Sequence, residues 1–233
     1  MVRDAVLEVV KRRALRVLHK TPEGEAVLLG VYLAGEEQAE SAVLLDAVVE
    51  SAPLWLARSM ERHRADEQRH AGLFRARLVA IGAEPTAPAL DPVSAWKLRR
   101  LRALGPRFSH KFRAGISVPL LAVAWRMEVM GVRVFARHVE VLEARGGQDA
   151  TLSLLRNVLA DERRHEASAK HSLDRLLGED VGDRFQALVR EVDAIERSFG
   201  ITGAFLLLAM GGWLWLKTAT RSFISRSPTP AGT

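Results

Sequence analysis

One short charged pattern occurs twice in the chain, and it constrains the fold more than any other feature. The pentapeptide DEQRH at 66–70 returns as DERRH at 161–165. In each copy a Glu and a His are three residues apart, so on a helix both side chains project from one face. Chance alone supplies roughly 0.5 Glu-x-x-His pairs in a chain of this composition, but not two copies of a five-residue pattern. The repeat therefore predicts two helices that present matching polar groups.

Apolar residues recur at helical spacing along almost the whole chain, and no segment alternates as a strand does. Asp91 followed by Pro92 is typical of a helix N-cap and first helical position, and Gly105-Pro106 predicts the end of that short helix. The expected helices cover about 2–20, 24–49, 54–81, 92–104, 107–145, 149–177 and 181–219. The fold class predicted is all-α: a four-helix bundle with one crossover connection and an additional C-terminal hydrophobic helix.

These helices group into four regions along the chain. They are a basic amphipathic N-terminal helix at 1–20, the four-helix bundle at 21–178, a C-terminal helix with a hydrophobic run at 179–219, and a disordered tail at 220–233.

Both copies of the repeat lie on helix faces that are otherwise mostly apolar, which places them in the core of the predicted bundle. A buried carboxylate without a partner is costly, and a metal ion supplies that partner. The competing interpretation is a pair of solvated faces rich in Asp, Glu and Arg. The chain has no Cys, so protein-bound metal must be held by carboxylate and imidazole groups, which suit iron, manganese and zinc.

The other two long helices are expected to supply one Glu each. Glu128 is the only acid between Asp91 and Glu140, and the alternative for it is a carboxylate hydrogen-bonded inside the bundle. In the first long helix Glu36, Glu37 and Glu40 compete. Glu36 is preferred because it lies on the apolar face and because its separation from Glu67 is similar to the separation of Glu128 from Glu162. Glu40 stays open as a substitute or extra ligand. The metal ligands predicted are Glu36, Glu67, His70, Glu128, Glu162 and His165.

Five further residues lie close to these predicted ligands. Asp66 and Asp161 can each accept the free ring N–H of a ligand histidine, although surface charge would also explain them. Tyr32 and Trp125 lie about one turn before a ligand and can carry an electron, with core packing as the alternative. His63, one turn before Glu67, is either a further ligand, a proton donor or a hydrogen-bonded core histidine.

The segment 199–216 contains no charged residue and, at about 27 Å as a helix, is near the minimum for spanning a bilayer. Trp213, Trp215 and Lys217 at its end fit an interface anchor. A buried fifth helix or an oligomer contact is the alternative. The net charge of +6 is gathered in clusters without a nucleic-acid-binding motif, so an anionic membrane surface is the expected partner and nucleic acid is not. No cleavable signal peptide is visible, and the chain is expected at the cytoplasmic face of a membrane.

At these residues the chain resembles the ferritin-like superfamily of di-iron carboxylate proteins, whose signature is the order Glu, Glu-x-x-His, Glu, Glu-x-x-His. The resemblance covers 25–178. The stretch AGEEQA at 34–39 is similar to one in demethoxyubiquinone hydroxylases, where the corresponding Glu is a ligand, and DERRHE at 161–166 is similar to the last motif of acyl-carrier-protein desaturases. The chain is much shorter than a desaturase, and its Arg-rich crossover departs from the hydroxylase pattern. The resemblance implies two iron ions as the cofactor, with manganese as the alternative.

Three functions follow as hypotheses. The first is a di-iron oxidoreductase that uses O2, an apolar small molecule such as a lipid or quinone, and an electron donor, at a membrane; a homodimer is compatible with it. The second is iron oxidation or peroxide removal, as in ferritins and rubrerythrins. The third is a membrane-anchored bundle whose metal is structural and not catalytic.

Overall fold

The chain is all-α throughout the part described by the computed structural model, which comprises residues 2–40, 52–89, 91–146, 149–178 and 182–224. Seven helices and no strand occur in these ranges, which confirms the predicted fold class at the level of secondary structure. The helices are α1 (Val2–Leu18), α2 (Pro22–Glu40), α4 (Leu54–Ala80), α5 (Pro92–Ser109), α6 (Ser117–Glu143), α7 (Ala150–Leu177) and α8 (Asp183–Ile224).

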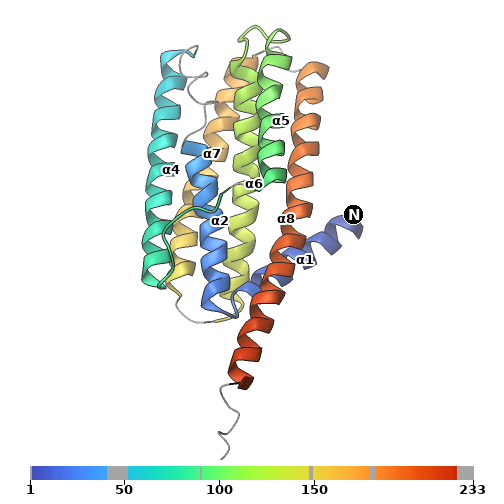
Figure 1. Cartoon of the computed structure of the whole chain (residues 1–233). Helices are drawn as coiled ribbons and strands as arrows, with labels where there is room; N and C mark the ends of the chain where they lie inside the picture. Colours follow the sequence, from blue (N-terminus) through green and yellow to red (C-terminus); the bar gives the residue numbers. More distant parts are fainter. Residues whose placement is uncertain (1, 41–51, 90, 147–148, 179–181, 225–233) are drawn as a thin grey trace, which may run out of the picture.

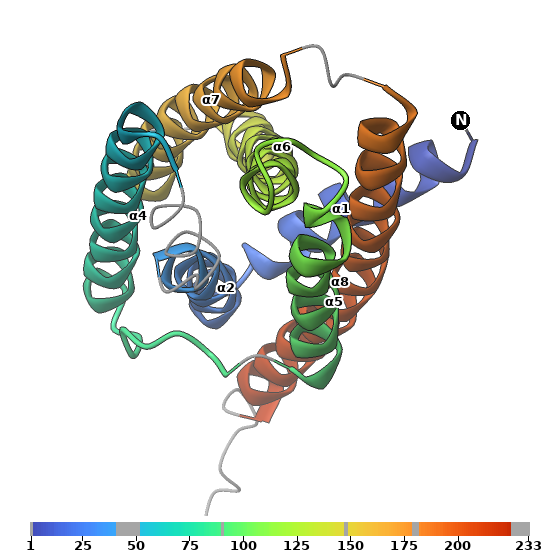
Figure 2. The same ribbon diagram turned by 90° about the horizontal axis from the view of Figure 1, so that it is seen from above.

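Four helices, α2, α4, α6 and α7, lie alongside one another around a common axis (Figures 1 and 2). The most extensive pairings among them are α6 with α7 and α2 with α4, and α4 also packs against α7. Helices α5 and α8 pack on α6 and on each other, away from α4. Helix α1 crosses α8 and contacts the beginning of α2 and the end of α6. The two repeat-bearing helices, α4 and α7, are therefore neighbours.

The ends of several helices agree with the chemistry of their flanking residues. The Asp91 carboxylate accepts hydrogen bonds from the backbone N–H groups of Val93 and Ser94 at 2.9 and 3.0 Å, which confirms the predicted N-cap. Asp149 caps α7 in the same way, through the N–H of Thr151 at 2.8 Å. Helix α7 ends at Leu177, and the residue after it, Gly178, has a φ of 51°, which favours glycine.

The prediction that Gly105-Pro106 ends the crossover helix is wrong, because α5 continues to Ser109. Proline within a helix costs one backbone hydrogen bond and some strain. The helix continues because Leu104 and Phe108, on either side of the proline, are both buried in the core. Gly105 serves close packing: a Cβ there would lie 2.8 Å from a methyl carbon of Leu120 on α6. The glycine that was interpreted as part of a helix end is therefore explained by the close approach of α5 and α6.

Three other predicted boundaries either differ from the described helices or lie outside the described residues. The third long helix was expected from 107, but α5 runs to Ser109 and α6 begins at Ser117. The first long helix was expected to reach residue 49; α2 is described as far as Glu40, and 41–51 lie outside the described residues. The disordered tail was expected from 220, but α8 runs to Ile224, so that expectation is wrong for 220–224. Residues 225–233 lie outside the described residues.

Helix α8 is long and apolar enough to cross a membrane. Its segment Asp183–Lys217 contains an 18-residue window with a mean hydropathy of 1.7, of which 12% is buried. Large apolar side chains, among them Phe205, Leu206 and Trp213, are more than half exposed there. A core helix of a soluble protein can pass the same length and hydropathy test but would be mostly buried. A single helix of this kind is weak support for membrane association.

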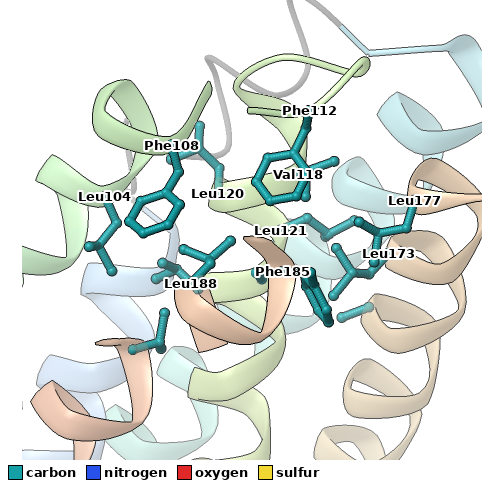
Figure 3. Packing of buried hydrophobic residues seen from close by; sticks show 14 of the residues in the cluster. Leu104, Phe108, Phe112, Val118, Leu120, Leu121, Leu173, Leu177, Phe185 and Leu188 are labelled. Atoms are coloured by element: carbon teal, nitrogen blue, oxygen red, sulfur yellow. The ribbon is translucent and has the colours of Figure 1, made fainter. Parts of the chain in front are cut away.

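Within the described ranges, the core consists of two apolar clusters with a polar layer between them. One cluster gathers α5, α8, the beginnings of α4 and α6 and the end of α7, around Phe108, Leu121, Leu173 and Leu188 (Figure 3). The other gathers α1, α2 and the opposite halves of α4, α6 and α7. Along α6, for example, Leu121 belongs to the first cluster and Phe135 to the second. The polar residues of the repeat lie between them, so both apolar clusters shield that layer from water.

Candidate metal centre

The structure brings together the six side chains that the sequence singled out, from four different helices. Helix α2 supplies one of them, α6 another, and α4 and α7 two each. Their exposed fractions range from 0% for His70 to 8% for Glu128, so all are buried. The six are Glu36, Glu67, His70, Glu128, Glu162 and His165. Buried clusters of Glu and His such as this one can hold metal ions.

The spacing inside the cluster fits shared ligands better than hydrogen bonds. The inward contacts are His70 Nδ1 to Glu36 Oε2 at 3.5 Å and to Glu162 Oε1 at 3.7 Å, and His165 Nδ1 to Glu67 Oε1 at 3.3 Å and to Glu128 Oε2 at 3.8 Å. Hydrogen bonds to nitrogen are usually about 2.7–3.2 Å long. Two ligand atoms, each about 2.1 Å from one ion, are separated by about 3.0–3.6 Å at octahedral to trigonal angles. A cation between these groups would therefore need little rearrangement.

Four of the inward atoms have no hydrogen-bond partner among the described residues. They are Glu67 Oε1, His70 Nδ1, Glu128 Oε2 and His165 Nδ1. A buried polar atom without a partner costs about 1–3 kcal/mol, and more if it is charged. Because all four atoms face the same small volume, one or two cations there would satisfy them together. The residues present thus fit a metal centre.

The outer nitrogens of the two histidines are held by aspartates, in a crossed arrangement between α4 and α7. His70 Nε2 on α4 donates to Asp161 on α7 at 3.1 Å, and His165 Nε2 on α7 donates to Asp66 on α4 at 3.1 Å. Arg69 donates to both aspartates. Since Nε2 carries the proton in each ring, the lone pair of Nδ1 points into the cluster, as a metal ligand requires. The sequence anticipated the aspartate–histidine pairing but not the exchange between helices.

Burial and mutual repulsion shift the pKa values of the four buried glutamates. Burial, together with the charges of Glu67 and Glu162, raises the pKa of Glu36 well above its usual range. Burial and the neighbouring Glu162 do the same to the pKa of Glu128, and burial with Glu67 raises the pKa of Glu162 to about 8. Burial also acts to raise the pKa of Glu67, but the neighbouring His165, Glu36 and His63 outweigh it and lower that pKa to about 2. The raised pKa values of Glu36, Glu128 and Glu162 favour the protonated carboxyl in the metal-free chain, and a bound cation would favour the ionised carboxylate instead.

The cluster has two overlapping halves. Glu36, Glu67, His70 and Glu162 each place one ligand atom within 4.8 Å of the others, and His63, Glu128 and His165 do the same. Two carboxylates reach both halves: Glu67 lies 3.3 Å and Glu162 lies 4.0 Å from His165 Nδ1. This arrangement accommodates two ions with Glu67 and Glu162 between them.

The choice among the three glutamates of the first long helix follows from their positions. Glu36 is buried in the cluster. Glu37 accepts a hydrogen bond from Arg75 at 2.6 Å on the outside of α2 and α4. The side chain of Glu40 lies outside the described residues.

The proposed relay residues have distinct surroundings. Tyr32 is buried, and its hydroxyl is 2.8 Å from His138 Nδ1, while His138 Nε2 contacts His19. Burial lowers the pKa of His138 to about 3, with a further contribution from His19. The sequence reasoning missed both histidines; the position of His138, three residues after Phe135 on the apolar face of α6, was the available signal. Trp125 is half-buried, with Lys170 of α7 at 5.7 Å from its ring.

Gly131 is a further residue that the sequence did not assign to the site. A Cβ built on Gly131 would lie 2.6 Å from Glu162 Oε2, with no space between them. Glycine on α6 thus allows the Glu162 carboxylate of α7 to lie against the helix backbone, one turn from Glu128. Glycine destabilises the interior of a helix, so its presence here is explained by the close approach of Glu162 and not by the needs of α6 itself.

Gly131→Ala is therefore expected to weaken metal binding by roughly 10-fold or more, because the added methyl group pushes the Glu162 carboxylate aside. The metal-free fold should be as stable or slightly more stable, since alanine favours helix by about 1 kcal/mol over glycine. Titration with Co(II) and thermal unfolding measure the two effects. Gly72→Ala on α4 is the matched control, because nothing lies within 4 Å of a Cβ there. Equal affinities of the two variants would contradict the proposed place of Glu162.

Comparison with known proteins identified no relative of this chain. No protein-family model, no curated protein and no solved structure matches it.

Proposed function

We propose that α2, α4, α6 and α7 form a ferritin-like four-helix bundle, in which α5 belongs to the crossover between α4 and α6. The bundle would hold two iron ions, with manganese as the alternative, and use O2 to oxidise or hydroxylate an apolar, lipid- or quinone-like substrate. The observation that carries this proposal is the convergence of six buried side chains, with four unpartnered inward atoms, on one small volume. Such a group of atoms has no evident structural purpose without cations.

The ligand roles follow from the two halves of the cluster. Glu36 and His70 would bind one ion, Glu128 and His165 the other, and Glu67 and Glu162 both. When bound, two ferrous ions would supply the electrons that reduce O2 and the oxidising power that acts on a substrate.

The chain's own groups would prepare the site in three ways. Asp66 and Asp161 hold the histidine rings so that Nδ1 points into the cluster, where the ions would be held. Because the pKa values of Glu36, Glu128 and Glu162 are raised, binding of the cations would displace protons from this group of carboxyls. The apolar clusters on both sides exclude water, which favours an apolar substrate and strengthens electrostatic interactions. Electrons must come from a donor, another protein or a small molecule.

Membrane association, at the cytoplasmic face, is proposed from α8 and α1. Trp213 and Trp215 are exposed, with Lys217 at 5.2 Å from the first ring and Lys20 of α1 at 5.1 Å from the second. Aromatic rings next to lysines are typical of segments at the boundary between lipid and water. The exposed apolar side chains of α8 would reach into the lipid, which is where an apolar substrate is found.

The double substitution Phe205→Asp/Leu206→Asp is expected to abolish binding of the full chain to vesicles that contain anionic lipid, because two charges would enter the apolar layer. Co-sedimentation with the vesicles measures it. Val79→Asp on α4, at an apolar side chain of similar exposure outside α8, should bind as the unchanged chain does. If the double variant still binds, α8 is not the membrane contact.

The experiment that tests the function is O2 uptake by the iron-loaded chain with a chemical reductant, with and without a membrane lipid extract. The proposal predicts uptake that rises with the extract, together with an oxidised product. Rapid oxidation of ferrous iron at a rate that does not change with the extract, with accumulation of iron mineral, would favour iron storage or peroxide removal instead. Full metal occupancy without O2 uptake would show that the metal is structural.

A further inference from the structure

The two halves of the metal centre differ in a residue outside the six: His63, one turn before Glu67 on α4. Its Nε2 lies 3.5 Å from Glu128 Oε1 and 3.6 Å from Glu67 Oε1. Its ring centroid is 4.2 Å from that of His165. The side chain is 13% exposed, so it belongs to the buried layer.

The distances from His63 Nε2 to the two carboxylates fit shared ligands better than hydrogen bonds, as do the distances among the six predicted ligands. They exceed the usual length of a hydrogen bond, about 2.7–3.2 Å, but match the separation of about 3.4 Å between two ligand atoms of one tetrahedral ion. Glu128 Oε2 and His165 Nδ1, on the other side of the same space, are buried without hydrogen-bond partners among the described residues. An ion placed among His63, Glu128 and His165 would satisfy all three side chains.

We propose that His63 is a seventh ligand, which binds the ion on the His165 side and makes the two metal positions chemically unequal. This inference rests on the proposed metal pair. The Glu36 side has one imidazole, from His70, whereas the His165 side has two.

The imbalance has a direct chemical consequence. Imidazole favours the later divalent metals such as cobalt, nickel and zinc, while sites dominated by carboxylates favour manganese. The His165 side therefore binds the first cobalt ion and binds it more tightly. The Glu36 side fills second and accepts earlier metals more readily.

Titration of the metal-free full chain with Co(II), followed by its visible absorption and by the bound stoichiometry, tests this inequality. The expected result is two steps of different affinity for the unchanged chain. In His63→Ala and His63→Gln the tighter step should weaken by roughly 10-fold or more, because one nitrogen ligand is lost, while the weaker step changes little. His171→Ala, at an exposed histidine of α7, is the matched control and should titrate as the unchanged chain does.

X-ray absorption of the unchanged cobalt-loaded chain gives a measure that does not depend on how the variants fold. Three imidazoles shared by two ions give an average of about 1.5 per ion, whereas two give about 1. Two bound ions with about 1 imidazole each, or variants whose two steps match those of the unchanged chain or weaken equally, would overturn the inference and leave the metal pair standing. An unchanged chain that binds no cobalt would instead overturn the proposed function itself.

Discussion

Glu162→Ala is expected to reduce the bound metal from about two ions per chain to well below one, and to abolish O2 uptake. Glu162 is within 4.0 Å of the inward nitrogens of both His70 and His165, so its loss removes a ligand from each ion. The remaining groups would not compensate, because α6 has Gly131, without a side chain, next to the position that Glu162 of α7 vacates. Metal analysis after passage over a desalting column measures the stoichiometry.

Glu37→Ala is the control for this variant, since Glu37 pairs with Arg75 outside the cluster and its loss should leave two ions bound. Glu162→Gln keeps the size of the side chain and separates loss of a ligand from creation of a cavity. Helix content measured by circular dichroism shows whether each variant is folded. If folded Glu162→Ala and Glu162→Gln both retain two ions, Glu162 does not bind the metal.

The second large effect is expected on stability when metal is removed. Between about pH 6.5 and about pH 8 the metal-free chain should become less stable as the pH rises, by on the order of 1–2 kcal/mol from Glu162 alone. The metal-loaded chain should not, because its carboxylates are already ionised by the cations and metal affinity rises as protons leave. Urea unfolding of both forms at the two ends of this range measures the difference.

The sign follows from the direction of each pKa shift. The pKa of Glu162 is raised from 4.5 to about 8 on folding, so its contribution to stability is present at low pH and is lost as the pH rises through that interval. Glu36 and Glu128 act in the same direction. His63 acts in the opposite direction, but only between about pH 4 and about pH 6.5, because burial lowers its pKa to about 4. A metal-free chain that gains stability from about pH 6.5 to about pH 8 would contradict the raised pKa values of these carboxyls.

Much of the helical framework and of the cluster could be predicted from the sequence, because both depend on regular spacing. Glu and His three residues apart must share a helix face, and apolar neighbours at helical intervals place that face in the core. Glu128 could be found because it is a single acid on a long apolar helix. Each of these features is a property of a single helix, so it can be predicted from the sequence of that helix alone.

What could not be predicted depends on how the helices approach each other. The crossed pairs His70–Asp161 and His165–Asp66 require α4 and α7 to be neighbours at a particular height. The contact of Gly131 with Glu162 likewise depends on how α6 and α7 pack. Helix α5 continues past Pro106 because packing against its neighbours outweighs the tendency of Gly105-Pro106 to end a helix. Periodicity gives the face of a residue and not its partner.

The most direct measurement of the central claim is iron X-ray absorption on the purified full chain loaded with ferrous iron, combined with metal analysis. About two ions per chain, with nitrogen and oxygen ligands only and an iron–iron distance of about 3–4 Å, is the predicted result. Less than one ion per chain at saturating iron, or isolated ions without an iron neighbour, would contradict the paired centre.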